Sequence, residues 1–332
     1  MTVREKTQEV ERLTLSPFAA LSEKSTGRGR EERDCPLRTP YQRDRDRIIH
    51  CKAFRRLKQK TQVFLSPEGD HYRTRLTHTL EVNQIARTIA RALRYNEDLT
   101  EAIALGHDLG HTPFGHAGER ALAQVSPCGF KHYEQSVRVA SQLEKEHRGL
   151  NLTHEVLNGL DRHTNGEWAA TLEGRVVRYA DRIAYINHDI EDAITAGVLR
   201  PSDLPKEAVE ILGSTKSQRI TTLISSLVEN SGDGELAMEP AVEEMYTLLH
   251  KYMYATVYVD PVAKAEEAKV EKLVGDLYTY FAGRPDAMPP FYVAIAEEEG
   301  VGRAVTDYIS GMSDDYAVRT FENLFVPQKW NL

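Results

Sequence analysis

Cysteine is scarce in this 332-residue sequence, which has only Cys35, Cys51 and Cys128, and their scattered positions show no paired spacing. Such a set excludes a small secreted domain held by disulfides and favours the reducing cytoplasm. Long hydrophobic runs are also missing: none approaches about 18 consecutive apolar residues, so we expect no membrane span. The first residues are polar and lack the apolar stretch of a signal peptide, so we expect no secretory signal. These absences predict a cytoplasmic protein without a membrane partner.

The alternation of polar and apolar residues that marks half-buried β-strands is nearly absent, and there is no internal repeat. Only residues 63–65, which precede a turn signal at residues 66–70, suggest a strand. Elsewhere apolar residues recur at helical spacing, and this pattern predicts an all-α protein. Helices are expected near residues 4–13, 41–60, 75–95, 99–109, from 117 onward, 136–145, 153–160, 175–196, 206–228, 238–256, 262–282, 289–297 and 302–311.

Composition divides the chain into three parts. Residues 1–40 form a polar N-terminal arm, and residues 41–205 form a core that contains the chemically informative segments. Pro201 and Pro205 mark the boundary to a helical C-terminal region, residues 206–332. Because this last region carries no obvious chemistry, we expect it to complete the fold and to supply contacts between subunits.

The net charge of −8 is unevenly distributed. Residues 28–60 contain twelve Lys and Arg against five Asp and Glu, so the remainder of the chain is strongly acidic. A basic segment in an acidic protein is typical of a site for a polyanion, such as nucleic acid or nucleotide phosphates. A solvated helix face with alternating Arg and Asp, as in residues 43–47, explains the same charges. The charge pattern alone leaves both interpretations open.

Histidine, in contrast, is concentrated: six of the twelve histidines lie between residues 71 and 132. Residues 107–119 read His-Asp-Leu-Gly-His-Thr-Pro-Phe-Gly-His-Ala-Gly-Glu, a density of metal-binding and proton-transferring groups that packing does not require. His107 and Asp108 are adjacent near a helix end, so both can reach one ion. His78 lies near the apolar stripe of the preceding helix, and Asp181 is flanked by apolar residues. A buried carboxylate or imidazole in such a place needs a partner.

Each of these residues also has an ordinary explanation. A single histidine facing a core is more often a packing residue with a hydrogen bond, and Asp181 beside Arg182 is a common salt-bridge pattern. The four together, distributed over successive helices, are much harder to explain by packing. Two imidazoles and two carboxylates suit a divalent cation: Mn²⁺, Fe²⁺, Co²⁺ or Zn²⁺, or Mg²⁺ where substrate phosphates share the coordination.

The pattern His78…His107-Asp108…Asp181 resembles the signature of HD-domain phosphohydrolases. The string from His107 to Glu119 is similar to one branch, the deoxynucleoside triphosphate triphosphohydrolases (dGTPase-like proteins). Residues 42–50, 54–58, 74–78 and 179–185 resemble the same branch. The resemblance covers residues 35–200 most clearly. It implies an HD-domain helical architecture over residues 41–205 and a metal held by His78, His107, Asp108 and Asp181.

The resemblance also implies a reaction, in which water attacks the α-phosphorus of a dNTP and releases a deoxynucleoside and tripolyphosphate. It assigns proton transfer to His116 with Glu119, which lie three residues apart and therefore on one helical face. Alternatively, Glu119 merely occupies a first helical turn, where acidic residues suit the helix dipole.

Further positions match the family's substrate contacts. Arg75, His111, Arg182 and Tyr185 match phosphate contacts, Gln62 and Asp189 match positions that read a 3′-hydroxyl, and His132 matches a histidine near the site. Each of them also has an ordinary surface or core explanation. Tyr133 stands where the family commonly has Asn, which puts the fine positioning of substrate in doubt.

The leading hypothesis is therefore a metal-dependent dNTP triphosphohydrolase, with dGTP as the first substrate to consider. An alternative is another HD phosphohydrolase, either a 5′-nucleotidase or a cyclic-nucleotide phosphodiesterase. A third is a regulator that binds nucleotides or nucleic acid. The resemblance implies a homo-oligomer (hexamer or tetramer), and a nucleotide effector or single-stranded nucleic acid as further partners.

Overall fold

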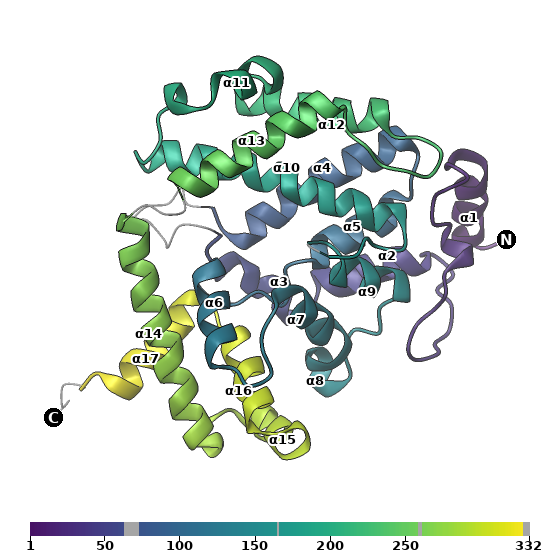
Figure 1. Cartoon of the computed structure of the whole chain (residues 1–332). Helices are drawn as coiled ribbons and strands as arrows, with labels where there is room; N and C mark the ends of the chain where they lie inside the picture. The colour runs from purple at the N-terminus through teal and green to yellow at the C-terminus, as the bar shows by residue number, and fades with distance from the viewer. Residues whose placement is uncertain (63–72, 165, 258–260, 328–332) are drawn as a thin grey trace.

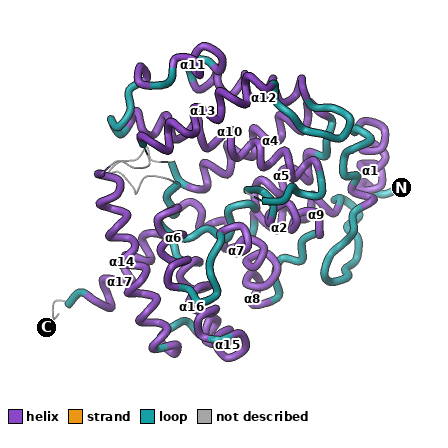
Figure 2. The backbone as a smooth tube through the Cα atoms, viewed as in Figure 1, coloured by secondary structure: helices purple, strands orange, loops and turns teal. Residues whose placement is uncertain are grey.

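A computed structural model describes residues 1–62, 73–164, 166–257 and 261–327, and these ranges consist of helices and loops (Figure 2). Extended pairing within them is limited to isolated β-bridges such as Arg28–Thr153. The all-α prediction is therefore confirmed. The strand predicted at residues 63–65 and the turn at residues 66–70 lie outside the described residues.

The helices follow one another along the chain as labelled in Figure 1. They are α1 (Val3–Thr14), α2 (Pro40–Ile49), α3 (Lys52–Arg56), α4 (Arg75–Leu93), α5 (Glu97–Gly106), α6 (Gly115–Val125), α7 (His132–Arg138), α8 (Glu144–His147), α9 (His154–Asp161), α10 (Leu172–Thr195), α11 (Lys206–Leu212), α12 (Lys216–Asn230), α13 (Pro240–Thr256), α14 (Pro261–Gly283), α15 (Pro290–Glu299), α16 (Val301–Ser310) and α17 (Asp314–Phe325).

Most predicted helices lie within a few residues of the observed ones, but the single helix predicted at residues 41–60 is wrong. The chain breaks at His50 and Cys51 between α2 and α3. The carboxylate of Glu144, distant in sequence, accepts hydrogen bonds from the backbone N–H groups of Lys52 and Ala53. These N–H groups have no partner inside the new helix, so the carboxylate favours a helix start at this point.

Two other helices differ from their prediction. The helix predicted at residues 206–228 is divided into α11 and α12 at Gly213, whose φ of +107° suits glycine. Helix α17, which follows an N-cap by Ser313, was not predicted. Its first residue, Asp314, turns out to be important for the position of the histidine-rich segment.

The buried apolar residues form two clusters. The first joins α2, α4, α5, α9 and α10 with α11–α13, and α4 and α10 lie side by side within it (Figure 1). The second joins α6 with α14–α17. Helices α11–α13 therefore pack with the first group, whereas the later helices pack against α6. The predicted boundaries at residues 40 and 205 stay predictions. The segment 107–116 connects the two clusters because it leaves α5 and enters α6.

The C-terminal helices fix this connecting segment, residues 107–116, through buried polar contacts. Lys60 donates from Nζ to the carbonyl oxygens of His111 and Ser310. Asp314 accepts hydrogen bonds from the backbone N–H of Thr61, from its hydroxyl, and from the N–H of Phe114. Phe114 has a φ of +62°, a conformation that costs free energy for a non-glycine residue. The carboxylate of Asp314 helps to hold it there.

Gly110 gives a direct test of how tightly the connecting segment packs on α7. A Cβ added at Gly110 would lie 2.1 Å from the backbone nitrogen of Ser136. We expect Gly110→Ala to cost about 1–3 kcal/mol of stability and to weaken metal binding, because the backbone must move. Thermal melting followed by circular dichroism measures the loss. The control Gly275→Ala in α14, where nothing lies within 4 Å, should gain up to about 1 kcal/mol. An unchanged melting temperature for Gly110→Ala would contradict this close packing.

The structure favours the salt-bridged interpretation of the basic segment. Arg28 pairs with Asp44 and Glu32, and Glu32 also pairs with Arg43 and Arg47. Further along, Arg38 and Arg45 pair with Asp46. Carboxylates therefore offset much of the positive charge of this segment. The nucleic-acid partner and the nucleotide effector stay predictions. Within the described ranges, no helix combines the length and the apolar character that a membrane span requires.

Candidate active site

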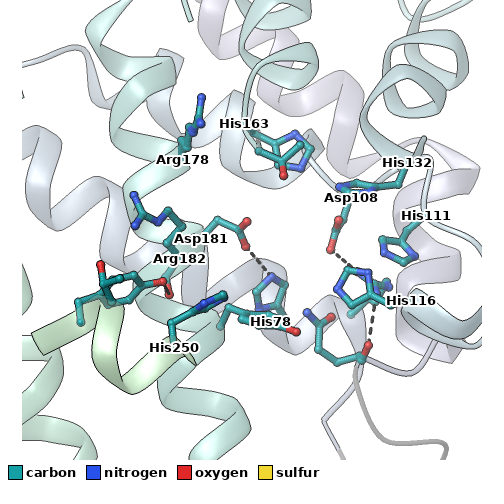
Figure 3. Close-up of a pocket in the computed structure, with 16 residues that line it drawn as sticks. His78, Asp108, His111, His116, His132, His163, Arg178, Asp181, Arg182 and His250 are labelled. Atoms are coloured by element: carbon teal, nitrogen blue, oxygen red, sulfur yellow. Dashed lines mark hydrogen bonds and ion pairs between the residues drawn. The ribbon is translucent and has the colours of Figure 1, made fainter. Parts of the chain in front are cut away.

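The four predicted metal ligands come from three helical elements that pack together in the first cluster. His78 is in the first turns of α4, which begins with a capping box at Thr74. Asp181 lies in the middle of α10. His107 and Asp108 lie immediately after α5, rather than within its last turn as predicted. His78, His107 and Asp108 are buried, and Figure 3 shows Asp181 directed toward His78.

Their ligand atoms converge. Nε2 of His78 lies 3.1 Å from Oδ1 of Asp181, and Nε2 of His107 lies 3.5 Å from Oδ2 of Asp108 and 3.9 Å from Oδ1 of Asp181. Ligand atoms of His78, His107 and Asp108 all lie within 4.8 Å of one another. His78, His107 and Asp108 therefore meet at one point, and Asp181 approaches the two histidines of this group.

His107 carries the feature that best fits a cation. Its Nδ1 lies 2.7 Å from the carbonyl oxygen of Ala104 and donates to it, which leaves Nε2 as the ligand atom. That Nε2 is buried and has no hydrogen-bond partner among the described residues. Burial disfavours the imidazolium, yet the carboxylates of Asp108 and Asp181 raise the pKa of His107 to about 9. The surroundings of Nε2 thus attract a positive charge, so these residues fit a divalent metal.

The side chains of His188 and Glu81 form a chain of contacts that begins at Nδ1 of His78 and orients its ring. Its Nδ1 lies 3.4 Å from Nδ1 of His188, and Nε2 of His188 contacts the carboxylate of Glu81. If Nε2 of His78 is to hold a cation, its Nδ1–H must donate to His188, which then donates its own Nε2–H to Glu81. Burial opposes ionisation of Glu81, but His188, Arg73 and Lys216 lower its pKa to about 2. Glu81 is therefore a permanent acceptor at the end of this chain.

We expect Glu81→Ala to weaken metal binding by about 10- to 100-fold, because His78 would lose the partner chain that fixes its tautomer. Isothermal titration of Mn²⁺ into metal-free protein measures this change. Glu191→Ala is the matched control, since Glu191 also pairs with Lys216 and Arg73, whereas the carboxylate paired with His188 is that of Glu81. Equal affinities in the two variants would show that the chain does not tune the site.

The predicted proton-transfer pair lies beside the metal ligands. Nδ1 of His116 is 3.3 Å from Oε2 of Glu119, both on the first turns of α6. The other carboxylate oxygen of Glu119 lies 2.8 Å from Nδ1 of His132. Burial opposes the charge of Glu119, but hydrogen bonds to His116 and His132 hold its pKa well below the usual range. Glu119 is thus an ionised acceptor that orients two imidazoles.

These side chains surround a cavity of about 540 Å³ (Figure 3). Most predicted site residues line it: Gln62, Arg75, His78, Asp108, His111, His116, His132, Asp181, Arg182 and Tyr185. Arg75, Arg178 and Arg182 supply fixed positive charge, and Figure 3 shows the last two on the side opposite His111, His116 and His132. Arginine suits phosphate oxygens because it presents several donors in one plane. The cavity therefore suits an anion larger than a single phosphate.

Three predicted residues are not in the cavity lining. His107 contacts the lining residues Asp108 and Asp181. Glu119 contacts the lining residues His116 and His132. Asp189 is fully buried on α10 and does not reach the cavity wall, so its predicted role in reading a 3′-hydroxyl has no geometric support here. Gln62, predicted for the same role, does line the cavity.

Several lining residues escaped the sequence analysis: His163, Thr164, Arg178, Tyr246, Thr247 and His250. Arg178 lies one helical turn before Arg182 on α10, so helical spacing offered a signal for it. Tyr246, Thr247 and His250 lie on α13, in the C-terminal region for which the sequence predicted packing and subunit contacts, so this region also contributes to the cavity lining. The guanidinium of Arg182 lies 4.9 Å from the ring centre of Tyr246, a cation–π contact that draws α13 to the site.

Comparison with known proteins agrees with this geometry. Residues 75–186 match the HD domain family, and residues 236–323 match the phosphohydrolase-associated domain. The chain is 55% identical to a deoxyguanosinetriphosphate triphosphohydrolase-like protein of Caldanaerobacter subterraneus, over 99% of this chain and 98% of that protein. A protein of the same description from Clostridium perfringens is 48% identical, over 99% of each chain. A solved phosphohydrolase from Bacteroides thetaiotaomicron shares the fold, with a TM-score of 0.54 at 19% identity, over 84% of this chain and 67% of that one.

Proposed function

Since the chain belongs to the deoxyguanosinetriphosphate triphosphohydrolase-like family of HD-domain hydrolases, we propose that it hydrolyses deoxynucleoside triphosphates to a deoxynucleoside and tripolyphosphate. The single observation that best supports this proposal is that His78, His107, Asp108 and Asp181 lie close together beside an arginine-lined cavity. A metal site beside a polyanion site is the arrangement that phosphoryl transfer from a triphosphate requires.

In this proposal His78, His107, Asp108 and Asp181 would hold the divalent metal. When bound there, it would polarise a phosphoryl oxygen as a Lewis acid and lower the pKa of water. The chain of His188 and Glu81 orients His78, and the carbonyl of Ala104 orients His107. The carbonyl of Ala104 therefore holds His107 in the tautomer that a cation needs, and His78 takes the same tautomer when its Nδ1–H donates to His188.

Proton transfer is assigned to His116. As water bonds to the α-phosphorus, the bond between that phosphorus and the 5′-oxygen breaks, and the 5′-oxygen must gain a proton. His116 lines the cavity, and ionised Glu119 accepts from its Nδ1 and stabilises the imidazolium. Nε2 of His116 is then the atom that donates a proton to the leaving oxygen or helps to activate water.

The arginines and His111 are assigned to the phosphates. Arg75 is buried, lines the cavity and pairs with Asp108 at 2.7 Å, so its guanidinium lies beside the metal ligands. Burial and the nearby guanidinium of Arg75 lower the pKa of His111, which keeps its imidazole neutral. A neutral His111 has one N–H, and its Nδ1 lies 3.4 Å from the carbonyl oxygen of Thr112, so it donates to a phosphate oxygen only if it leaves that carbonyl. Arg178 and Arg182 supply charge from α10.

The products decide between this function and its alternatives. We expect purified protein incubated with each dNTP and Mn²⁺, Mg²⁺ or Co²⁺ to release deoxynucleoside and tripolyphosphate, resolved by ion-exchange chromatography. A 5′-nucleotidase instead releases orthophosphate from a monophosphate, and a cyclic-nucleotide phosphodiesterase opens a cyclic ester. No deoxynucleoside with any metal, alone or with a second nucleotide added, would overturn the proposal. The same assay ranks dGTP against the other dNTPs.

A further inference from the structure

An exposed tryptophan lies beside the cavity and contacts one of its arginines. Trp168 is 45% exposed, and the guanidinium of Arg178 lies 4.2 Å from the centre of its ring. The same ring stacks on Tyr179, with ring centres 5.5 Å apart and an interplanar angle of 22°. Arg178 lines the cavity, whereas Trp168 is not among the lining residues. Trp168 is therefore connected to the cavity through the side chain of Arg178.

Aromatic rings hold both arginines on this side of the cavity (Figure 3). Arg178 and Arg182 lie one turn apart on α10, so their like charges repel each other. The guanidinium of Arg182 lies 5.9 Å from the ring centre of Tyr179 and 4.9 Å from that of Tyr246. Burial and the charge of Arg182 lower the pKa of Arg178. A cation–π contact fixes a guanidinium without cancelling its charge, whereas a carboxylate partner would cancel it, so both charges remain available to an anion.

The hydrogen bonds of Arg178 also leave donors available. Its Nη1 donates to the carbonyl oxygens of Gly166 and Glu167, at 3.1 and 3.3 Å. Within the described ranges, Nε and Nη2 of Arg178 form no hydrogen bond, and no carboxylate pairs with this guanidinium. Nε and Nη2 form one edge of the guanidinium plane, and two parallel donors on one edge suit a phosphate group.

Anchoring of the loop that precedes α10 explains the tryptophan less well. Two other hydrogen bonds already hold this loop. The N–H of Ala170 donates to Oδ1 of Asn158 at 2.8 Å, and Nε of Arg175 donates to the carbonyl oxygen of Ala169 at 2.9 Å. Burial is not the explanation either, because nearly half of Trp168 remains exposed. Neither reason requires an indole ring over an arginine of the cavity.

We propose that Trp168 is a positioning residue: its ring holds the guanidinium of Arg178 in place, and Arg178 binds a polyphosphate anion together with Arg182. Two planar guanidiniums on successive turns of one helix can bind oxygens of more than one phosphate group. Trp168 contacts no reacting atom, so it should affect binding and leave the rate of the chemical step unchanged. That the anion is the triphosphate of a dNTP rests on the proposed function. Binding of an inorganic polyphosphate does not depend on it.

Isothermal titration of inorganic tripolyphosphate into the full chain, with Mg²⁺ present, tests this role without any hydrolysis. Trp168→Leu keeps an apolar side chain beside Tyr179 but removes the aromatic face over Arg178, so its Kd should rise about 3- to 10-fold. Trp168→Phe retains an aromatic face and should recover most of the affinity. Phe18→Ala removes another exposed aromatic residue, 49% exposed and outside the cavity lining, and should leave Kd unchanged.

A double-variant cycle tests whether the tryptophan acts through the arginine. In an Arg178→Met background, Trp168→Leu should cause no further loss of affinity, because the guanidinium that it positions is gone. Equal Kd values for the wild-type protein and Trp168→Leu overturn the positioning role. The same fold-loss from Trp168→Leu with and without Arg178 overturns the assigned route.

The tryptophan also supplies a spectroscopic signal. The only other tryptophan of the sequence, Trp330, lies outside the described residues. In the variant Trp330→Phe, saturating tripolyphosphate should change the emission of Trp168, because the anion binds the guanidinium that stacks on its ring. Unchanged emission at saturation would contradict binding at Arg178.

Kinetics separate this proposal from the proposed function. If the protein hydrolyses dGTP, Trp168→Leu should raise KM by about the same 3- to 10-fold at unchanged kcat. A fall in kcat with unchanged KM would overturn the positioning role. If no dNTP is hydrolysed but the tripolyphosphate results hold, the proposed reaction fails and the role of Trp168 in anion binding stands.

Discussion

Removal of the His116 imidazole is expected to lower kcat for dNTP hydrolysis by about 10²- to 10⁴-fold, the usual contribution of a general acid or base. The 5′-oxygen would then leave without a positioned proton donor. His116 is not among the four residues assigned to the metal site, so Mn²⁺ affinity in His116→Ala should equal that of the wild-type protein. Steady-state kinetics with dGTP and isothermal titration with Mn²⁺ measure the two quantities separately.

The matched control is His154→Ala, because His154 is an exposed histidine at the start of α9 and should leave kcat unchanged. Glu119→Gln gives a second comparison. It retains the size of the side chain but loses the charge that stabilises the imidazolium, so its kcat should lie between those of the wild-type protein and His116→Ala. If His116→Ala turned over dGTP at the wild-type rate, the assigned proton donor would be wrong.

Asp108→Asn is expected to abolish metal binding and turnover together. The carboxylate lies 3.5 Å from Nε2 of His107 and forms one group of candidate ligands with His78 and His107. It also carries the ion pair of buried Arg75, at 2.7 Å. Removing one partner of a buried pair leaves an uncompensated charge, which costs about 3–5 kcal/mol of stability. Metal content by elemental analysis and the free energy of unfolding in urea give the two effects.

The double variant Asp108→Asn with Arg75→Met separates these two effects. Without the guanidinium, no charge is left unpaired, so most of the lost stability should return. Metal binding should not return, because it depends on the carboxylate. If the single variant Asp108→Asn still bound Mn²⁺ at the wild-type stoichiometry, Asp108 would not be a ligand.

Local sequence carries much of this protein's architecture and chemistry. Helical periodicity predicted most helices within a few residues, since a helix buries one face and that face repeats along the chain. The histidine-rich string and its relation to His78 and Asp181 indicated the metal site, because few packed segments require that many imidazoles and carboxylates. The structure brings these residues together.

Tertiary structure decided what depends on residues distant in the chain. Glu144 stabilises the break between α2 and α3. The apolar periodicity within residues 41–60 does not predict this break. Helix α13 reaches the cavity through Tyr246 and His250, whereas Asp189 turns into the core despite its place on the same helix as Asp181.

The sequence by itself determined the helical class, the family and the chemical identity of the candidate metal ligands. These follow from composition and from patterns that repeat over a few helical turns. Only the tertiary structure decided which nitrogen of His107 is available, which carboxylate orients His116 and His132, and which helices close the cavity. Such features arise from contacts such as that of Glu119 with His132, and the pairing of distant residues leaves no periodic trace in the chain.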